Sequence, residues 1–577
     1  MSREYKNKRK FFLLSATIPA VVVCYVIFAY GVDVPFADEW EIAPFFTKKA
    51  QGRLAFSELF ALVNEYRQFF PNLIFVHLGW LTGWDVRFEM LLSFLLACLV
   101  SHNIYRLGRR TLRLEGDTHL WAFLLSSLII FSLVQYENWL MGQQVIYFIP
   151  IACVTTCLLI SQADMGIWKR LIICAALSTV SSFSSANGIL CWVVTLPALT
   201  RAESLKAFAR LRWPTAVWCL GFALCAALYL YDFQRPSSLP STSESLSKPW
   251  LAVAYFLSLL GSPLTGFSRY LSPVAVLVGL ALSVMFVRAW VSYLKCVPDA
   301  DLRRRMLCWL MLGIYSAATA ALITFGRAGF GLYQALNSRY TTFSLYLVVA
   351  LIHLSAIVRG AVGRPRGERL PRAPRRLTAA IVILLGLHLL ATVNSIRHVG
   401  EFRLRVLHSK ACLLFINLVG GRCRAQVSPD FSLLQERARA LDELGFLRPG
   451  LLSSRRVRDF AERVEPHPAY GSFERLIRES GTYVASGIAA LPGRREPADA
   501  VLLTYRDGEG QDVLFAVAEM DYKGDFLKRL LNERALFSWQ HSFTSEAIPA
   551  GAGELSAWAF DADSGRAFKL EGVHNLR

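Results

Sequence analysis

This sequence lacks the phosphate-binding signatures of soluble nucleotide-dependent enzymes. No glycine-rich loop follows a predicted strand, and no G-x-G-x-x-G pattern opens a βαβ unit. The chain also has no internal repeat, and most of its 12 cysteines lie in or beside apolar runs without metal-ligand spacing. Such thiols are ordinary small apolar side chains. A soluble nucleotide-sugar donor is therefore unsupported, and these cysteines have no metal-binding pattern.

Acidic residues are few, with 43 Asp and Glu against 62 Lys and Arg, which gives a net charge of +19. A nucleic-acid partner is the first explanation to consider for such a charge. The basic residues, however, cluster in short loops between apolar runs near 20 residues long, which is the positive-inside pattern of membrane proteins. With 54% hydrophobic residues, the chain is predicted to be a polytopic α-helical membrane protein that binds membrane lipids and no nucleic acid.

The basic segment 1–10 places the N-terminus in the cytoplasm. The first apolar run has no convincing cleavage site, so we expect it to stay as a membrane helix. The Arg-rich loop 359–376 marks the cytoplasmic side again. About 11 spans follow from this pattern, with an extracytoplasmic C-terminus and a location in a bacterial inner membrane. They are Phe11–Tyr30, Phe88–Arg106, Leu120–Gln135, Val145–Ser161, Trp168–Ser182, Ile189–Leu199, Pro214–Tyr231, Val274–Leu294, Leu307–Phe325, Thr342–Val358 and Leu377–Ala391.

A long first outer loop covers residues 31–86 of the predicted membrane domain, 11–396. Short surface helices are expected at Trp40–Phe46 and Leu54–Val63. Phe70–Trp84 is apolar but reaches only about 22 Å as a helix, less than the roughly 30 Å of a bilayer core. We therefore expect a juxtamembrane helix there.

Residues 397–577 are predicted to form a small extracytoplasmic α+β domain. Its part 397–480 has helical periodicity, and 481–577 is β-rich with an antiparallel β-sandwich. The expected strands are Val501–Tyr505, Val513–Val517, Ala557–Phe560 and Ala567–Leu570. Cys412 and Cys423 are the cysteine pair in this oxidising compartment, which makes a disulfide between them plausible. Two buried thiols are the alternative.

Polar residues gather in four of the predicted outer loops. They are Asp38, Glu39 and Trp40 with Glu65 and Arg67; Glu137, Asn138 and Gln143; Asn187; and Arg327, Arg339 and Tyr340. Ionisable groups at a bilayer boundary are candidates for function. The structural alternative is that each Arg extends to the interface and each Glu caps a helix or forms an ion pair.

The chemistry open to these residues is sugar transfer from a lipid-linked phosphate. Asp38, with Glu39 beside it, is the candidate base that takes a proton from the acceptor hydroxyl. Arg327 and Arg339, with Tyr340 and Arg67, are candidate ligands of the donor phosphate, because a guanidinium matches phosphate oxygens. The other substrate-binding candidates are Glu65, Glu137, Asn138, Gln143, Asn187 and Trp40. Asp38 and Glu137 could also hold a divalent cation, Mg or Mn.

The order of these motifs resembles the C-type glycosyltransferase superfamily (GT-C). Asp38-Glu39 matches its first acidic motif, Glu137 its second, and Phe70–Trp84 its juxtamembrane helix. Asp38–Trp40, Asn64–Arg67, Glu137–Asn138, Asn187–Gly188 and Ser338–Tyr340 are also similar to motifs of uncharacterised bacterial members, with Tyr66 where those have His. The resemblance covers roughly residues 10–400, and each motif is short.

This resemblance implies a polyprenyl-phosphate sugar donor and an inverting transfer on the extracytoplasmic face. A third acidic loop is missing, which leaves a metal in doubt and favours an envelope glycan or lipid over a peptide as acceptor. The competing functions are a polysaccharide polymerase and a lipid-linked glycan flippase or transporter. A transporter should show repeats and charges near the midplane, and a polymerase should have a large Arg-rich outer loop. Neither pattern is found.

Overall fold

The computed structural model describes residues 3–63, 65–112, 117–200, 211–234, 240, 247–266, 272–295, 299–362, 375–419, 423, 427, 433–479, 481–494, 496–520, 537–549 and 553–576. The chain divides into two units. The helical unit contains Met1–Gly31, Ala55–His77 and Arg87–Val399, and the second unit contains Val32–Leu54, Leu78–Val86 and Gly400–Arg577. The first outer loop is thus shared between them.

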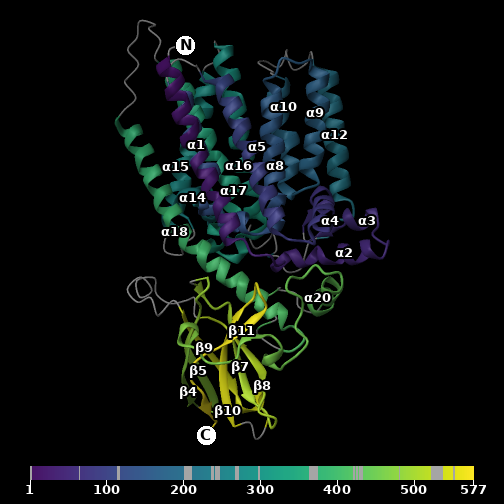
Figure 1. Ribbon diagram of the computed structural model, residues 1–577. Coiled ribbons are helices and arrows are strands. Elements are labelled where there is room, and N and C mark those ends of the chain that lie inside the picture. Colours follow the sequence, from purple (N-terminus) through teal and green to yellow (C-terminus); the bar gives the residue numbers. More distant parts are fainter. Residues whose placement is uncertain are drawn as a thin grey trace. The chain divides into compact units, whose positions relative to one another are not determined.

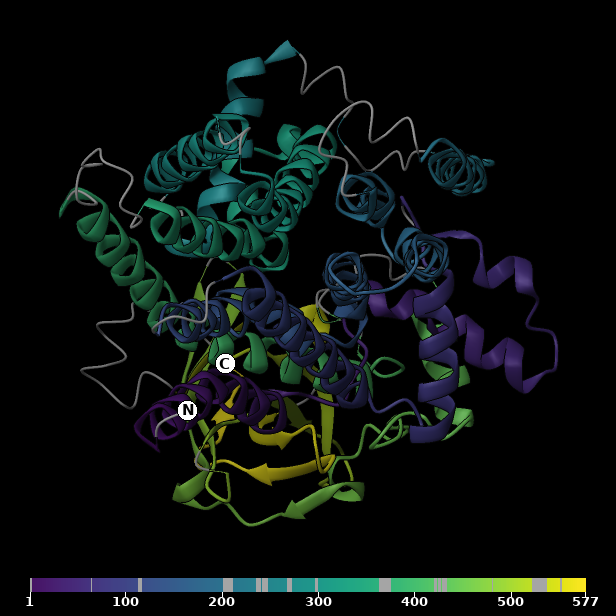
Figure 2. The ribbon, with the colours of Figure 1, turned by 90° about the horizontal axis from the view of Figure 1, so that it is seen from above.

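The helical unit is a bundle of long apolar helices (Figure 1), which Figure 2 views nearly end-on. In chain order the α-helices are α1 (Arg3–Tyr30), α3 (Phe56–Leu59), α4 (Phe69–Thr82, whose last residues belong to the second unit), α5 (Arg87–Thr111), α6 (Thr118–Ile130), α7 (Tyr136–Leu140), α8 (Val145–Ser161), α9 (Ile167–Ser182), α10 (Leu190–Thr200), α12 (Arg212–Leu230), α14 (Pro249–Thr265), α15 (Ser272–Lys295), α16 (Ala300–Arg327), α17 (Ser338–Val362) and α18 (Arg375–Leu414, which continues into the second unit).

Eight helical segments of the described residues are long and apolar enough to cross a membrane. Shorter apolar helices lie at Phe69–Thr82, Ala186–Thr200 and Pro249–Thr265. The predicted mainly helical, multispanning fold is confirmed. The juxtamembrane prediction corresponds to α4, whose 14 residues make it too short to span a bilayer core.

Two glycines allow α14 and α15 to approach each other closely. A Cβ on Gly261 would lie 2.0 Å from the Ala275 carbonyl oxygen, and one on Gly279 would lie 1.8 Å from the Leu257 carbonyl oxygen. Small residues permit this approach. In lipid no hydrophobic driving force acts between helices, and close van der Waals packing stabilises their association instead.

The second unit contains a β-sandwich of two sheets (Figure 1). One sheet has the order β3-β11-β10-β7-β8 with β12 beside β10, and the other has β4-β5-β6 with β9 beside β5. The pairings are antiparallel except that β3 runs parallel to β11. The strands are β3 (Ala461–Arg463), β4 (Gly471–Glu479), β5 (Thr482–Leu491), β6 (Glu496–Pro497), β7 (Ala500–Arg506), β8 (Asp512–Ala518), β9 (Ser538–Thr544), β10 (Glu554–Asp561), β11 (Arg566–Lys569) and β12 (His574–Asn575).

The central strands β7 and β10 are buried on both faces. Val501, Leu503 and Ala557 point into the core between the two sheets. On the opposite face Phe560 packs against Phe415, 4.9 Å between ring centroids, just beyond the end of α18. Strands covered on both sides read as continuous apolar runs rather than as an alternating pattern, which is what the sequence has here.

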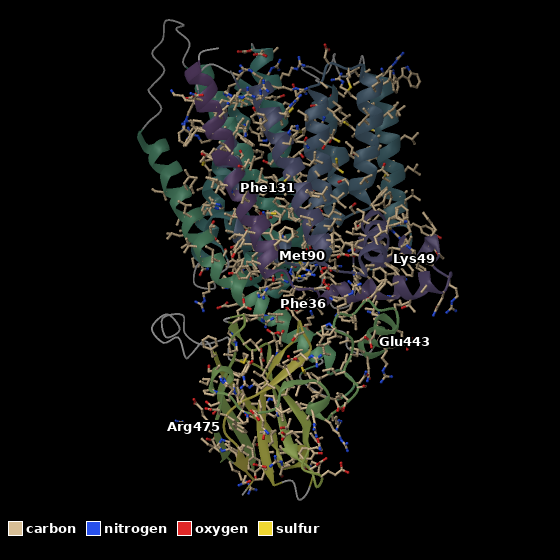
Figure 3. The ribbon with its side chains drawn as sticks, in the orientation of Figure 1. Phe36, Lys49, Met90, Phe131, Glu443 and Arg475 are labelled. Atoms are coloured by element: carbon tan, nitrogen blue, oxygen red, sulfur yellow. A yellow bond between two sulfur atoms is a disulfide. The ribbon has the colours of Figure 1, made fainter. Side chains whose placement is uncertain are left out.

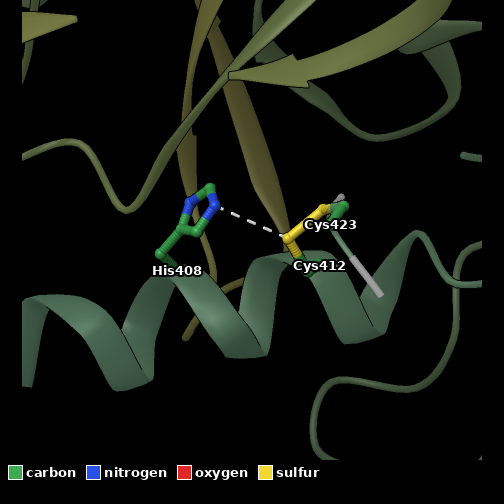
Figure 4. Close-up of side chains that lie close together, drawn as sticks. All are labelled: His408, Cys412 and Cys423. Atoms are coloured by element: carbon green, nitrogen blue, oxygen red, sulfur yellow. Dashed lines mark hydrogen bonds between the residues drawn. A yellow bond between two sulfur atoms is a disulfide. The ribbon is translucent and has the colours of Figure 1, made fainter. Parts of the chain in front are cut away.

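A disulfide joins Cys412, in the last turns of α18, to Cys423. Figure 4 shows His408 one turn earlier on the same helix, with Nε2 3.6 Å from the Cys412 sulfur. His408 Nδ1 lies 3.2 Å from the carbonyl oxygen of Asp499, immediately before β7. Burial lowers the pKa of the His408 imidazole, so the ring is neutral at pH 7. His408 thus contacts the residue that precedes β7, whereas the disulfide joins α18 to Cys423, a residue outside the strands.

The first outer loop also contributes to the second unit, through η1 (Ala37–Glu41) and α2 (Ala43–Ala50). Arg437 of α20 (Leu434–Glu443) donates to the Trp40 carbonyl at 3.1 Å and pairs with Glu41 at 2.8 Å. Phe36, labelled in Figure 3, meets Phe402 edge-on at 5.8 Å. These contacts hold the predicted acidic motif within this unit.

Candidate functional site

A short hairpin in the helical unit presents Glu65 and Tyr66. It is formed by β1 (Leu62–Val63) and β2 (Tyr66–Arg67). Arg67 donates to the carbonyls of Tyr229 at 2.8 Å, Phe60 at 3.0 Å and Tyr231. The Tyr229 hydroxyl donates in turn to the Glu65 carbonyl at 2.8 Å. Because its donors are used by backbone carbonyls, Arg67 fixes the hairpin rather than facing a ligand, contrary to its predicted phosphate-binding role.

Glu65 forms an ion pair with Arg327, the last residue of α16. The Arg327 Nη2 lies 2.5 Å from Glu65 Oε1, and the two side chains remain 18% and 22% exposed. Burial raises the pKa of the Tyr66 phenol, and the positive charge of Arg327 opposes that rise. Its guanidinium lies over the Tyr340 ring, 5.7 Å from the centroid. The pair is shielded from bulk water yet still accessible.

Glu137 lies where α7 meets the N-terminus of α17. Its Oε2 accepts from the Arg339 backbone N at 3.1 Å and lies 4.0 Å from Arg339 Nε. A carboxylate is favourable at a helix N-terminus because unpaired N–H groups and the helix dipole meet there. Asn138 donates to the Arg339 carbonyl at 3.0 Å and to Thr342. These contacts fix the backbone from which the Arg339 side chain extends, 35% exposed.

Helix α7, which makes these contacts, is fully buried. Trp139 is 0% exposed, its Nε1 donates to the Ser132 carbonyl at 3.0 Å, and its ring stacks on Phe131, which Figure 3 labels. Such a residue is part of the core. The packing makes α7 a rigid support for Glu137.

Tyr340 is the centre of the cluster, because Arg327, Arg339, Glu65 and Glu137 all act on its phenol electrostatically. Two tyrosines that sequence reasoning missed belong to the same cluster. Tyr147 on α8 interacts electrostatically with Tyr66, Tyr340 and both arginines, and Tyr255 on α14 does so with Tyr340 and Arg327. Both lie inside apolar helical runs. Tyr147 follows the Gln143-Gln144 pair closely, and this position is the sequence feature that could have identified it as a site residue.

Two predicted residues of the helical unit lie outside this cluster. Asn187 donates to the Tyr315 hydroxyl at 2.8 Å, and Tyr315 precedes Arg327 on α16 by about 18 Å of helix. Gln143 is buried in the turn before α8. Asn187 is therefore a buried packing contact rather than a ligand of the cluster. Asn64 lies outside the described residues.

The acidic motif of the first outer loop belongs to the second unit. Glu39 is buried, and its Oε2 accepts from the Phe36 backbone N at 2.8 Å, so it caps its own short helix. Trp40 is 1% exposed and is a core residue rather than a platform for a sugar. Asp38 is half-buried. Ala37 before it has φ of 53°, a conformation that a non-glycine residue rarely adopts and that is enriched at functional sites.

Possible metal ligands occur in two places. Asp38 and Glu137 belong to different units, and their predicted divalent-cation site remains a prediction. His408, Cys412 and Cys423 lie close enough together to share an ion. A metal binds cysteine as thiolate, and these two sulfurs are bonded to each other (Figure 4). In this oxidised state the cluster offers one imidazole and no thiolate.

No protein-family model matches the chain, and no curated protein matches it. Among solved structures, ArnT from Cupriavidus metallidurans in the apo state is 15% identical, over 62% of this chain and 79% of that chain, with a TM-score of 0.29. The undecaprenyl phosphate-bound structure of the same protein is 15% identical, over 61% and 79%, with a TM-score of 0.28. A likeness of this size carries no argument for fold or function.

Proposed function

We propose that this protein is a membrane glycosyltransferase that moves a sugar from a polyprenyl-phosphate donor to an envelope glycan or lipid. The observation that carries the proposal is the cluster around Tyr340, in which Arg327 and Arg339 lie at the ends of membrane helices and pair with Glu65 of the hairpin and Glu137 of α7. Charged groups in such positions are costly and are typically kept for function. The motif order, which resembles the GT-C superfamily, supports the same activity.

The donor phosphate is proposed to bind Arg327 and Arg339. Guanidinium groups match phosphate oxygens and stabilise the charge that grows on a departing phosphate. Glu65 orients Arg327 through their ion pair, and Glu137 orients Arg339 by holding its backbone N–H. Both carboxylates are thus positioning residues. Tyr66 and Tyr340 complete the wall of the phosphate site with hydroxyl groups.

Asp38 is proposed as the general base, on the strength of its motif and of the unusual backbone at Ala37. The acceptor hydroxyl oxygen forms a bond to the anomeric carbon while the bond from that carbon to the phosphate oxygen breaks. The proton passes to Asp38, and the polyprenyl phosphate leaves with the bonding electron pair. Attack from the face opposite the leaving group inverts the anomeric centre. Glu39, which caps its own helix, positions Asp38.

Purified protein incubated with synthetic polyprenyl-phosphate sugars, with water or a glycan as acceptor, tests the proposal. The wild type should consume the donor, and Asp38→Asn and Arg339→Ala should each lower turnover at least about 100-fold, the size of effect of a lost proton acceptor or charge stabiliser. Parallel reactions with EDTA test the divalent cation.

Matched controls are Asp459→Asn and Arg456→Ala, the same chemical changes at exposed positions of the second unit. Both should keep wild-type turnover. If no donor is consumed, or if Asp38→Asn is fully active while folded, the proposed mechanism is wrong. Flux of lipid-linked glycan in proteoliposomes would then test the transporter alternative.

A further inference from the structure

A groove of about 580 Å³ lies in the helical unit among α6, α14, α15, α16, α17 and α18. Its walls are mainly apolar. On α6 it is lined by Thr118, Trp121, Ala122, Leu125 and Ile129, a single face of that helix. α18 stands at the margin of the bundle in both views (Figures 1 and 2) and supplies Leu384 and Leu385 to the wall.

The groove extends about half-way through a bilayer. On α17 it runs from Gly360, near the helix end, to Val348, which is about 18 Å at 1.5 Å per residue. On α6 it runs from Thr118 to Ile129, about 16 Å. Half of a hydrocarbon core is roughly 15 Å thick. This depth fits an acyl chain from one leaflet and is too short for a long polyprenyl chain.

Two arginines line the groove at the end that contains Gly360, Arg305 on α16 and Arg359 in the last turn of α17. The Arg305 side chain is 14% exposed, and its ion-pair partner Asp301, 3.1 Å away, is 74% exposed. A pair with so exposed a carboxylate is weak, so a phosphate can replace that carboxylate. Trp121, 53% exposed, packs edge-on against Phe12, as tryptophans at the lipid–water interface do.

We infer that this groove binds an anionic glycerophospholipid of the leaflet at the Arg305 end, with one acyl chain between α6, α17 and α18 and the phosphate on Arg305 and Arg359. Basic pockets between transmembrane helices recognise anionic headgroups in this way. The site lies at the opposite ends of α16 and α17 from Arg327 and Arg339. It is therefore separate from the donor site and independent of the proposed transferase activity.

Native mass spectrometry of the delipidated full-length protein, titrated with phosphatidylglycerol and separately with phosphatidylcholine, tests this inference. We expect phosphatidylglycerol to bind more tightly. Arg305→Gln and Arg359→Gln should each raise its Kd about fivefold, as expected for about 1 kcal/mol per basic residue near an anionic lipid, and the double variant about 25-fold. Arg304→Gln, the same change one residue away and outside the groove, is the matched control.

A second variant tests the acyl chain separately. Ala356→Trp fills the groove below the arginines and should abolish phosphatidylglycerol binding while leaving the arginines in place. The inference is overturned if the double variant or Ala356→Trp binds phosphatidylglycerol like the wild type. It is equally overturned if phosphatidylcholine binds as tightly, if Arg304→Gln weakens binding as much as Arg305→Gln, or if undecaprenyl phosphate binds this site more tightly than phosphatidylglycerol.

Discussion

The two units each contain a cluster of arginine and carboxylate side chains. The clusters differ in how completely their charged groups are paired within the protein. In the second unit Arg494 lies 2.5 Å from Asp499, 3.2 Å from Asp563 and 3.3 Å from Asp561. Asp499 is wholly buried, and its second oxygen accepts from the Ala562 backbone N at 2.7 Å. Every carboxylate in that cluster has a fixed cationic or backbone partner.

In the helical unit Arg327 pairs with the carboxylate of Glu65 and lies near two aromatic rings, Tyr66 and Tyr340. Both members of the pair remain partly exposed, and Arg339 is more exposed still. Breaking a saturated buried network destabilises a fold, because removing one partner leaves a desolvated charge. A partly exposed cluster with aromatic walls is suited to a ligand that carries its own charge. The comparison predicts opposite responses to the same substitution.

Arg494→Met should give the largest loss of stability. It leaves Asp499 buried without its cation, and breaking such a pair costs about 3–5 kcal/mol. Hydrogen exchange of the β7 and β10 amides in the full-length protein measures the effect. Arg506→Met is the matched control. Arg506 pairs with Glu554 at the surface, where the two side chains are 49% and 34% exposed. Losing this pair should cost less than about 1 kcal/mol. Equal effects of the two variants would show that the buried network is not special.

Arg327→Met should have the converse result. The proposed loss of charge stabilisation lowers kcat/KM roughly 100- to 1,000-fold, or about 2.7–4 kcal/mol of transition-state stabilisation. Exchange of the amides in α16 and α17 should change by less than about 1 kcal/mol, since the pair with Glu65 is partly exposed. Arg327→Lys keeps the charge and should retain part of the activity. If Arg327→Met destabilises the fold as much as Arg494→Met does, Arg327 is a structural residue and the proposed difference between the two clusters is wrong.

Much of this fold was predictable from the sequence. Apolar runs near 20 residues have few physical solutions other than membrane helices, and the strands around Val501 and Ala557 followed from β-branched and aromatic runs bounded by turn residues. Strands β4, β5 and β9 were missed. β4 carries many charged residues on an exposed face, and β5 is rich in Ala, Ser and Gly, so neither reads strongly as a strand.

The sequence predicted which residues belong to the site but not which groups they contact. Glu65, Glu137, Arg327, Arg339 and Tyr340 were each found as polar residues next to apolar runs, and the structure gathers them. Sequence patterns give no partner for a side chain, so the backbone contacts of Arg67 and the burial of Trp40 were not foreseen, and helix capping was named only as a general alternative for every Glu. Tyr147 and Tyr255 were hidden inside helices, where a tyrosine reads as an apolar core residue.

The smallest predicted effect concerns pH and the saturated cluster. Burial raises the pKa of the Asp499 carboxyl from its ordinary value near 4 to about 7, against the opposing attraction of Arg494 and the Ala562 N–H. The folded state therefore binds this proton more tightly than the unfolded state. Its contribution to stability is fully present below pH 4 and is lost as pH rises through 7.

Between pH 6 and 8 the loss from this group should be about 1.4 kcal/mol, one pH unit of bound-proton difference. Exchange of the β7 and β10 amides at several pH values, corrected for the intrinsic pH dependence of exchange, measures it. Asp499→Asn has no proton to lose and should flatten the profile in this range, although Arg494 loses a charged partner. Glu65→Gln should leave the profile of the second unit unchanged. A wild-type profile that is flat or rises from pH 6 to 8 would mean that Arg494 outweighs burial and keeps Asp499 ionised. The two clusters would then differ in access to a ligand rather than in the balance of charge.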